Sequence, residues 1–200
     1  LFLAFAFDSG SELESQIEIA KILFPRLDYF EAENLLSEVR EIFNGKNEPQ
    51  ATQDRYGKTG FAEQCMMARR LVENGVKFVS INYGGWDMHT GIKEGYAGRA
   101  PELDHGLSIL LQDLNEKGLL DTTMVVVTAE FSRTLLNKDA GRDHHPGITS
   151  LLLAGGNYIG RGAIGAIEKD GMFPKDKPYG PIDLLNTVLT HMEVSGKTQF

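Results

Sequence analysis

The chain has 200 residues, which is enough for one folded domain with its own hydrophobic core. Hydrophobic residues make up 42% of it and charged residues 24%, proportions typical of a globular protein and not of a disordered one. The formal net charge of −8 argues against a nucleic-acid or anionic membrane partner, because phosphate groups are bound by clustered lysines and arginines.

The first 45 residues are predicted to be a mainly helical lead-in. Apolar side chains recur at helical spacing over residues 12–24 and again over 29–43, and Pro25 separates the two patterns. The opening LFLAFAF is too short for a signal peptide and has no basic flank. No apolar run approaches the roughly 18 residues of a membrane-spanning helix, so we expect no membrane span.

From residue 46 to residue 200, predicted helices and strands alternate. Helical periodicity predicts helices over residues 61–75, 103–118 and 181–192, and runs of apolar or β-branched residues predict strands over 76–83, 122–130 and 149–156. Cys65 lies on the apolar side of the first helix and is expected to be a small core residue. The last two strands are continuously apolar, which is typical of strands buried on both faces of a parallel sheet. The expected fold class is therefore α/β, with a mostly parallel sheet and right-handed crossovers.

Polar side chains of the kind that bind metals stand at the ends of the predicted strands. GGWDMH follows the first strand directly, Glu130 ends the second, and GRDHHPG, which is predicted to be a loop, precedes the third. Ligands bind beyond the carboxyl ends of strands in an open α/β sheet, so we expect these side chains to meet at one rim. The candidate metal ligands are Asp87, His89, Glu130, Asp143 and His144, and the candidate catalytic cations are Arg133 and Arg142.

Carboxylates and imidazoles are the mixed oxygen and nitrogen donors that zinc, manganese and iron accept. Alternate residues of an extended segment point the same way, so Asp87 and His89 can face a single ion. Arginine suits a phosphate or sulfate oxygen. The alternatives are a polar turn for the Asp-x-His pair and a helix-capping or salt-bridged acid for Glu130. His105 and His191 are expected to be structural.

Four segments resemble the DUF1501 proteins, a bacterial family of the alkaline phosphatase and sulfatase superfamily. They are YGKTGFAEQCMMARRLVENGVKFVSINYGGWDMH, LLQDLNEKGLLDTTMVVVTAEFSRT, GRDHHPGITSLLLAGG and PIDLLNTVLTHM. The resemblance covers residues 42–192, with the segments in the family's order. It implies an alkaline-phosphatase-like α/β/α sandwich of which this chain holds only the C-terminal half. It also implies a divalent metal ion (Zn, Mn, Ca or Mg) and a periplasmic or otherwise exported location.

The resemblance further implies roles for individual residues. Asp87 and His89 stand where the superfamily supplies a ligand pair, and Glu130 stands where its relatives place an aspartate followed by a histidine. His144 matches the histidine of the family's GRDHWP and a late histidine ligand of phosphatases. His145 takes the place of the tryptophan in that motif.

Two functions remain open at this point. The first is a metal-dependent hydrolase of small phosphate or sulfate esters, in which the arginines offset developing negative charge. Its nucleophile would come from the missing N-terminal half or from a partner chain, since nothing in residues 1–50 resembles that part of the family. The second is a catalytically inactive relative that acts as a binding or surface protein. A purely structural fragment that packs on a partner is a further alternative.

Overall fold

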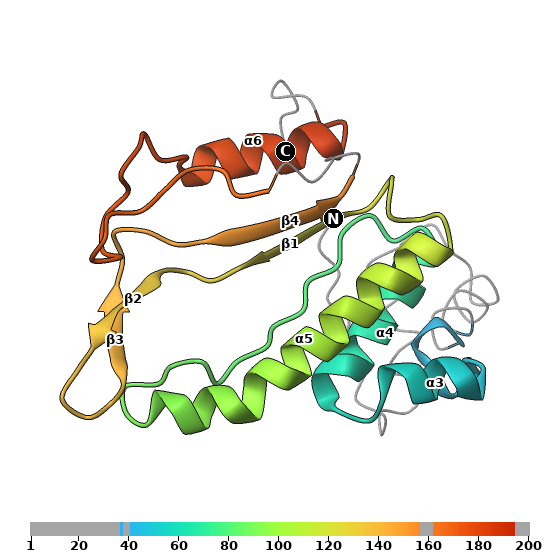
Figure 1. The fold of residues 1–200 in the computed structure, drawn as a ribbon. Helices are drawn as coiled ribbons and strands as arrows, with labels where there is room; N and C mark the ends of the chain where they lie inside the picture. Colours follow the sequence, from blue (N-terminus) through green and yellow to red (C-terminus); the bar gives the residue numbers. More distant parts are fainter. Residues whose placement is uncertain (1–36, 38–40, 157–161, 195–200) are drawn as a thin grey trace, which may run out of the picture. The chain divides into compact units, whose positions relative to one another are not determined.

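The computed structural model describes residue 37, residues 41–156 and residues 162–194 (Figure 1). The chain divides into two units, Leu1–Pro49 and Gln50–Phe200. In the first unit a short 3-10 helix, η1 (Gly45–Asn47), begins after Asn44, whose side chain accepts a hydrogen bond from the N–H of Lys46. The helix predicted over 12–24, and most of the one predicted over 29–43, lie outside the described residues.

The second unit contains four helices and four strands among its described residues. They are α3 (Gln50–Tyr56), α4 (Gly60–Glu73), α5 (Ile92–Glu116), β1 (Met124–Thr128), β2 (Ser132–Leu136), β3 (Arg142–His145), β4 (Leu151–Gly155) and α6 (Pro181–His191) (Figure 1).

 The helices predicted over 61–75, 103–118 and 181–192 are confirmed. Helix α5 also begins well before residue 103 and continues through Pro101.

Helices α4 and α5 pack together around the core of this unit. Thr59 caps the start of α4 by accepting a hydrogen bond from the N–H of Ala62, and Gly75 follows its end with a φ of 83°. Gly106 of α5 lies against Phe61 of α4, where an added Cβ would come 2.8 Å from the ring. The buried apolar residues of this cluster are Tyr56, Phe61, Ala62, Cys65, Met66, Leu110 and Leu114. Burial raises the pKa of the Cys65 thiol to about 12, which agrees with a core role.

A buried charge network crosses this core. The carboxylate of Asp113 on α5 accepts hydrogen bonds from the Tyr56 hydroxyl at 2.9 Å and from Arg69 Nε at 2.8 Å. Arg69 also contacts Glu73 at 2.6 Å, one turn further along α4. The side chains of Arg69 and Asp113 are only 1% and 8% exposed, so each charge depends on the other for its stabilisation. The network ties α3, α4 and α5 together.

The predicted parallel sheet is wrong. Strands β1 and β4 pair antiparallel, with Val126 opposite Leu153, and β2 and β3 also pair antiparallel, with Arg133 opposite His144. Strands β2 and β3 lie between β1 and β4 in the sequence. The N–H of Ser132 donates to the Ile148 carbonyl at 2.8 Å, at the point where the β1–β4 ladder gives way to the β2–β3 ladder. The described strands therefore form a long hairpin (Figure 1) and not an alkaline-phosphatase-like sandwich. A hairpin needs no crossover helix, and the sequence between β1 and β4 contains none.

Two further local predictions differ from the structure. GRDHHPG was predicted to be a loop, but its residues Arg142–His145 form β3 because they pair with β2. Residues 76–83 were predicted to be a strand, but they carry no ladder within the described part of the chain. They run extended beside α5, where Tyr83 stacks on Phe61 with ring centroids 4.5 Å apart and donates to Glu102 at 2.7 Å. Contacts of the Tyr83 side chain with α4 and α5, and not strand pairing, therefore hold the end of this segment.

Within residues 41–156 and 162–194, and at residue 37, no helix has both the length and the apolar character needed to cross a membrane.

The buried network generates a stability prediction. Replacing Asp113 by Ala leaves the Arg69 charge and the Tyr56 hydroxyl inside the core without their shared acceptor, and we expect a loss of about 3 kcal/mol in the free energy of unfolding. Urea denaturation measures the loss. Glu116→Ala is the control, because Glu116 lies on the same helix but pairs with Arg55 in solvent. Equal, small changes in both variants would contradict the role given to Asp113.

Candidate metal centre

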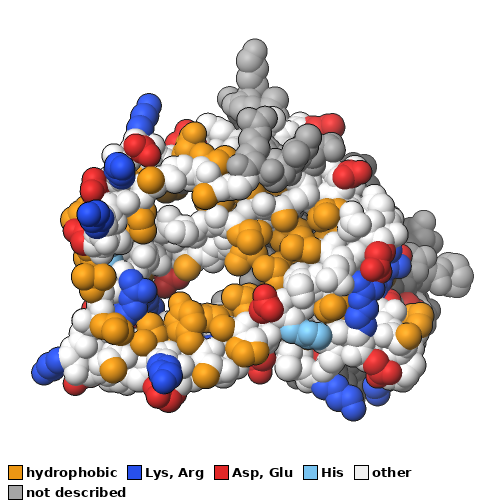
Figure 2. Space-filling view, viewed as in Figure 1, with side chains coloured by type: hydrophobic (Ala, Val, Ile, Leu, Met, Phe, Trp, Pro, Cys, Tyr) orange, Lys and Arg blue, Asp and Glu red, His pale blue; other side chains and the backbone are white. Residues whose placement is uncertain are grey.

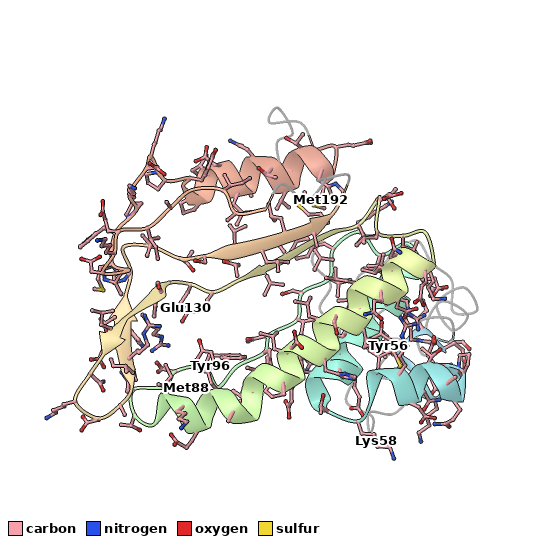
Figure 3. The ribbon with its side chains drawn as sticks, viewed as in Figure 1. Tyr56, Lys58, Met88, Tyr96, Glu130 and Met192 are labelled. Carbon is pink, nitrogen blue, oxygen red and sulfur yellow. The ribbon has the colours of Figure 1, made fainter. Side chains whose placement is uncertain are left out.

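The segment before α5 is anchored by a methionine. Met88 is buried and packs against α5 at Gly95, where an added Cβ would lie 2.4 Å from the Met88 sulfur (Figure 3). Asp87 and His89 flank Met88 and are both exposed. Alternation along an extended segment sends their side chains away from α5, as the Asp-x-His pattern predicted.

The end of the β2–β3 hairpin lies directly against this segment. The N–H of Arg142 donates to the Met88 carbonyl at 2.9 Å, and the N–H of Ile92 donates to the Ala140 carbonyl at 2.9 Å. Gly141 is buried between them, and a Cβ added there would come within 2.0 Å of the His89 carbonyl carbon and oxygen. Only glycine leaves room for this approach, which explains the first residue of GRDHHPG.

Three donor side chains converge where the two segments meet. One ligand atom from each of Asp87, His89 and His144 lies within 4.8 Å of the other two. The Asp87 Oδ1 atom is 2.9 Å from His144 Nε2, 3.0 Å from His89 Nε2 and 2.5 Å from Arg133 Nη1. His144 and Arg133 reach it from opposite strands of the hairpin, as a directly facing cross-strand pair.

Asp143 joins the group through a histidine. Its Oδ1 atom lies 2.8 Å from His89 Nδ1, on the side of the ring opposite Asp87. The same oxygen accepts a hydrogen bond from the Asn137 side-chain amide at 3.3 Å. Asp143 thus orients His89, a role that carboxylates commonly play next to a metal-bound histidine. We call Asp87, His89, Arg133, Asp143 and His144 the Asp87 cluster.

The other predicted site residues are placed differently. Arg142 turns its guanidinium to the backbone of β2, where it donates to the carbonyls of Thr134 and, at 3.3 Å, of Arg133. Glu130 lies between β1 and β2 (Figure 3), and it is not one of the three residues whose donor atoms converge. His145 contacts the Met172 carbonyl and the Phe173 ring instead of the cluster. His105 contacts the carbonyls of Arg55 and Tyr56, in keeping with a structural role.

Asn137 is a site residue that the sequence analysis missed. Besides Asp143, its side-chain amide reaches the His89 carbonyl at 3.0 Å. The available signal was its position at the start of NKDAG, a turn-like composition between two runs that suit strands.

The electrostatics of the cluster follow from its donors. The hydrogen bond from His144, followed by that from Arg133, lowers the pKa of Asp87 to about 2. The His89 hydrogen bond, and then the Asn137 amide, lower the pKa of Asp143. With neutral histidines, two carboxylates face one guanidinium, so the cluster keeps an excess of negative charge. Its carboxylates are accessible, since the Asp87 side chain is 60% exposed and that of Asp143 is 54% exposed.

These residues fit a divalent metal ion by the chemistry of their donors. Two imidazole nitrogens and one carboxylate oxygen form a three-ligand set of the kind found in catalytic zinc sites, which keep a fourth position open. Calcium and magnesium prefer oxygen ligands alone, so the donor set favours zinc or manganese over them. Asp87, His89 and His144 would hold the ion. Asp143 would orient His89 through the contact of its carboxylate with Nδ1 of the ring.

A family model described as "Protein of unknown function (DUF1501)" matches residues 11–200. The chain belongs to the DUF1501 family. The match begins well before residue 42, where the resemblance of the sequence segments starts. No curated protein and no solved structure matches the chain.

The close approach at Gly141 generates a second prediction. Gly141→Ala should push the His89 backbone away and separate the two halves of the cluster, at a cost of about 1–3 kcal/mol in the free energy of unfolding. Gly147→Ala is the matched control in the same motif, because its added Cβ would meet mainly the movable His145 ring. Chemical denaturation and the histidine NMR signals report both effects. Unshifted His89 and His144 signals in Gly141→Ala would contradict this packing.

The pKa of Asp87 generates a third prediction. Because its pKa in the folded protein is lowered, the interactions of Asp87 stabilise the fold above the ordinary carboxyl pKa of about 4 and are lost as the pH falls towards 2. A carboxyl NMR titration should give a midpoint near 2, and Arg133→Gln should raise it towards the ordinary value. An ordinary midpoint in the unmodified protein would show that the cluster is not assembled.

Proposed function

We propose that this chain is part of a metal-dependent hydrolase that acts on small phosphate or sulfate esters. The observation that carries the proposal is the convergence of Asp87, His89 and His144 within 4.8 Å, with Arg133 in contact with the same carboxylate oxygen. The relationship to phosphatases and sulfatases is part of the proposal and rests on the sequence motifs. The antiparallel hairpin lends it no support.

The geometry around His89 favours a cation at this point. If Nδ1 carries the proton that is donated to Asp143, then the lone pair of Nε2 faces Asp87 Oδ1 at 3.0 Å. Two lone pairs at that distance repel each other unless a positive charge lies between or beside them. A metal ion relieves the repulsion, and so do a second proton on the imidazole and the Arg133 guanidinium, which lies 2.5 Å from the same oxygen. The first possibility belongs to the hydrolase, and the other two need no metal.

In the hydrolase, the ion would polarise a phosphoryl or sulfuryl oxygen of the ester. Within the Asp87 cluster, Arg133 is the side chain that can offset negative charge on the substrate, because its guanidinium can pair with two oxygens. Hydrolysis consumes water, and we propose that the group that activates it comes from a partner chain or from another part of the whole protein. Arg142 has no part in this scheme, because its guanidinium is bound to β2.

The alternative is a non-catalytic binding or surface protein in which the Asp87 cluster is a structural link. Its support is the contact of Arg133 with Asp87 at 2.5 Å, which already neutralises that carboxylate without a metal. In this case the cluster joins the segment before α5 to the β2–β3 hairpin by hydrogen bonds and ion pairs alone.

Metal content provides the fourth prediction. The purified chain should bind about one Zn²⁺ or Co²⁺ ion, more tightly as the pH rises through the histidine range, because the imidazoles must be deprotonated to bind it. Asp87→Ala and His144→Ala should lose the ion. His145→Ala is the matched control, since this neighbouring histidine faces Met172 and Phe173. Elemental analysis and isothermal titration calorimetry measure the binding.

The same proteins should then be assayed on phosphate and sulfate esters. Turnover that disappears with a chelator and returns with the metal supports the hydrolase. The chain could instead bind metal without turnover, even when it is combined with a chain that supplies the rest of a site. That result supports the alternative, a non-catalytic binding or surface protein. Undiminished metal content in both ligand variants would contradict the site itself.

A further inference from the structure

The side chain of Asn137 uses its full hydrogen-bonding capacity at the Asp87 cluster. Its Oδ1 atom accepts from the N–H of Asp139 at 3.0 Å and from the N–H of Gly141 at 2.9 Å. Its Nδ2 atom donates to the His89 carbonyl at 3.0 Å and to Asp143 Oδ1 at 3.3 Å. An asparagine amide offers two donor hydrogens and one oxygen with two lone pairs, so all four positions are in use.

The oxygen and the nitrogen of this amide have different roles. The oxygen shapes the turn between β2 and β3, as asparagine side chains do in many tight turns. The nitrogen reaches out of the turn to the two residues that set the orientation of one imidazole. One is His89 itself, held by its backbone, and the other is Asp143, whose carboxylate contacts His89 Nδ1 at 2.8 Å. A residue that served the turn alone would need only the oxygen.

We infer that Asn137 is a positioning residue of the metal centre, holding Asp143 and His89 so that His89 Nδ1 carries the proton and Nε2 faces the ion. The metal part of this inference rests on the function proposed above. The tautomer part does not, because it concerns a hydrogen bond that is present without metal. A histidine that donates Nδ1–H to a carboxylate keeps its Nε2 lone pair free to bind a metal.

Asn137→Asp isolates the nitrogen half of the amide. The variant has nearly the same shape and keeps an oxygen to accept from Asp139 and Gly141, but it loses both donor hydrogens. It also places a second carboxylate against Asp143, which we expect to move away from His89. Lys138→Gln is the matched control, because it lies in the same turn, is exposed and makes the same change of one unit in net charge. It separates loss of positioning from a general effect of charge.

The test uses the whole 200-residue chain and two measurements. Long-range ¹H–¹⁵N NMR spectra of the metal-free protein, at a pH where histidine is neutral, identify which ring nitrogen of His89 carries the proton. Calorimetry with Zn²⁺ measures affinity. We expect the Nδ1–H form in the unmodified protein and in Lys138→Gln. In Asn137→Asp we expect a mixture of both forms and an affinity about 10- to 100-fold weaker.

Each outcome decides one part of the inference. An Nε2–H form of His89 in the unmodified protein overturns the positioning role, as does an unchanged tautomer in Asn137→Asp. If the unmodified chain binds no Zn²⁺, the proposed metal site fails, while the tautomers still decide whether Asn137 orients His89. If Asn137→Asp does not fold, as judged by circular dichroism, Asn137→Ser replaces it, since serine removes the same donors without adding charge.

Discussion

The close approach of two backbones at Gly141 is the constraint on which the Asp87 cluster depends. Residues 87–89 carry one half of the cluster and the β2–β3 hairpin carries the other, and the chain between them includes the whole of α5. The two halves meet because Gly141 has no side chain to hold the His89 backbone away. Backbone hydrogen bonds then fix the register, and ion pairs on Asp87 complete the contact.

The scaffold behind this contact is built from two different kinds of stabilisation. Helices α4 and α5 share an apolar core that is crossed by the buried pair of Arg69 and Asp113. Met88 then fixes the ligand segment to α5 by filling the space left at Gly95 (Figure 3). The surface of this unit carries apolar side chains as well as charged ones (Figure 2). The two halves of the exposed cluster are thus held by the packing of Met88 on α5 and by backbone hydrogen bonds from the hairpin.

Sequence patterns predicted the helices well because each helix buries one face, and the residues of that face recur in the sequence at helical spacing. They also placed Asp87, His89 and His144 together, although for a reason that was wrong. The expected rim of a parallel sheet does not exist here. A continuous apolar strand such as β1 does not reveal its partner, and β1 pairs with β4 across a hairpin. The pairing direction depends on the connection, which periodicity does not describe.

The sequence by itself determined the helices, the core position of Cys65 and the identity of the donor side chains, because these follow from spacing and from side-chain chemistry. Only the tertiary structure decided which donors meet. In the folded chain Asp143 contacts Nδ1 of His89, and the guanidinium of Arg142 binds the backbone of β2. Glu130 is not one of the three residues whose donor atoms converge. The tertiary structure also revealed Asn137. The reason is that the hydrogen bond from Asn137 to His89 joins residues 48 positions apart. Such a contact depends on how the chain folds back on itself, which local sequence patterns do not describe.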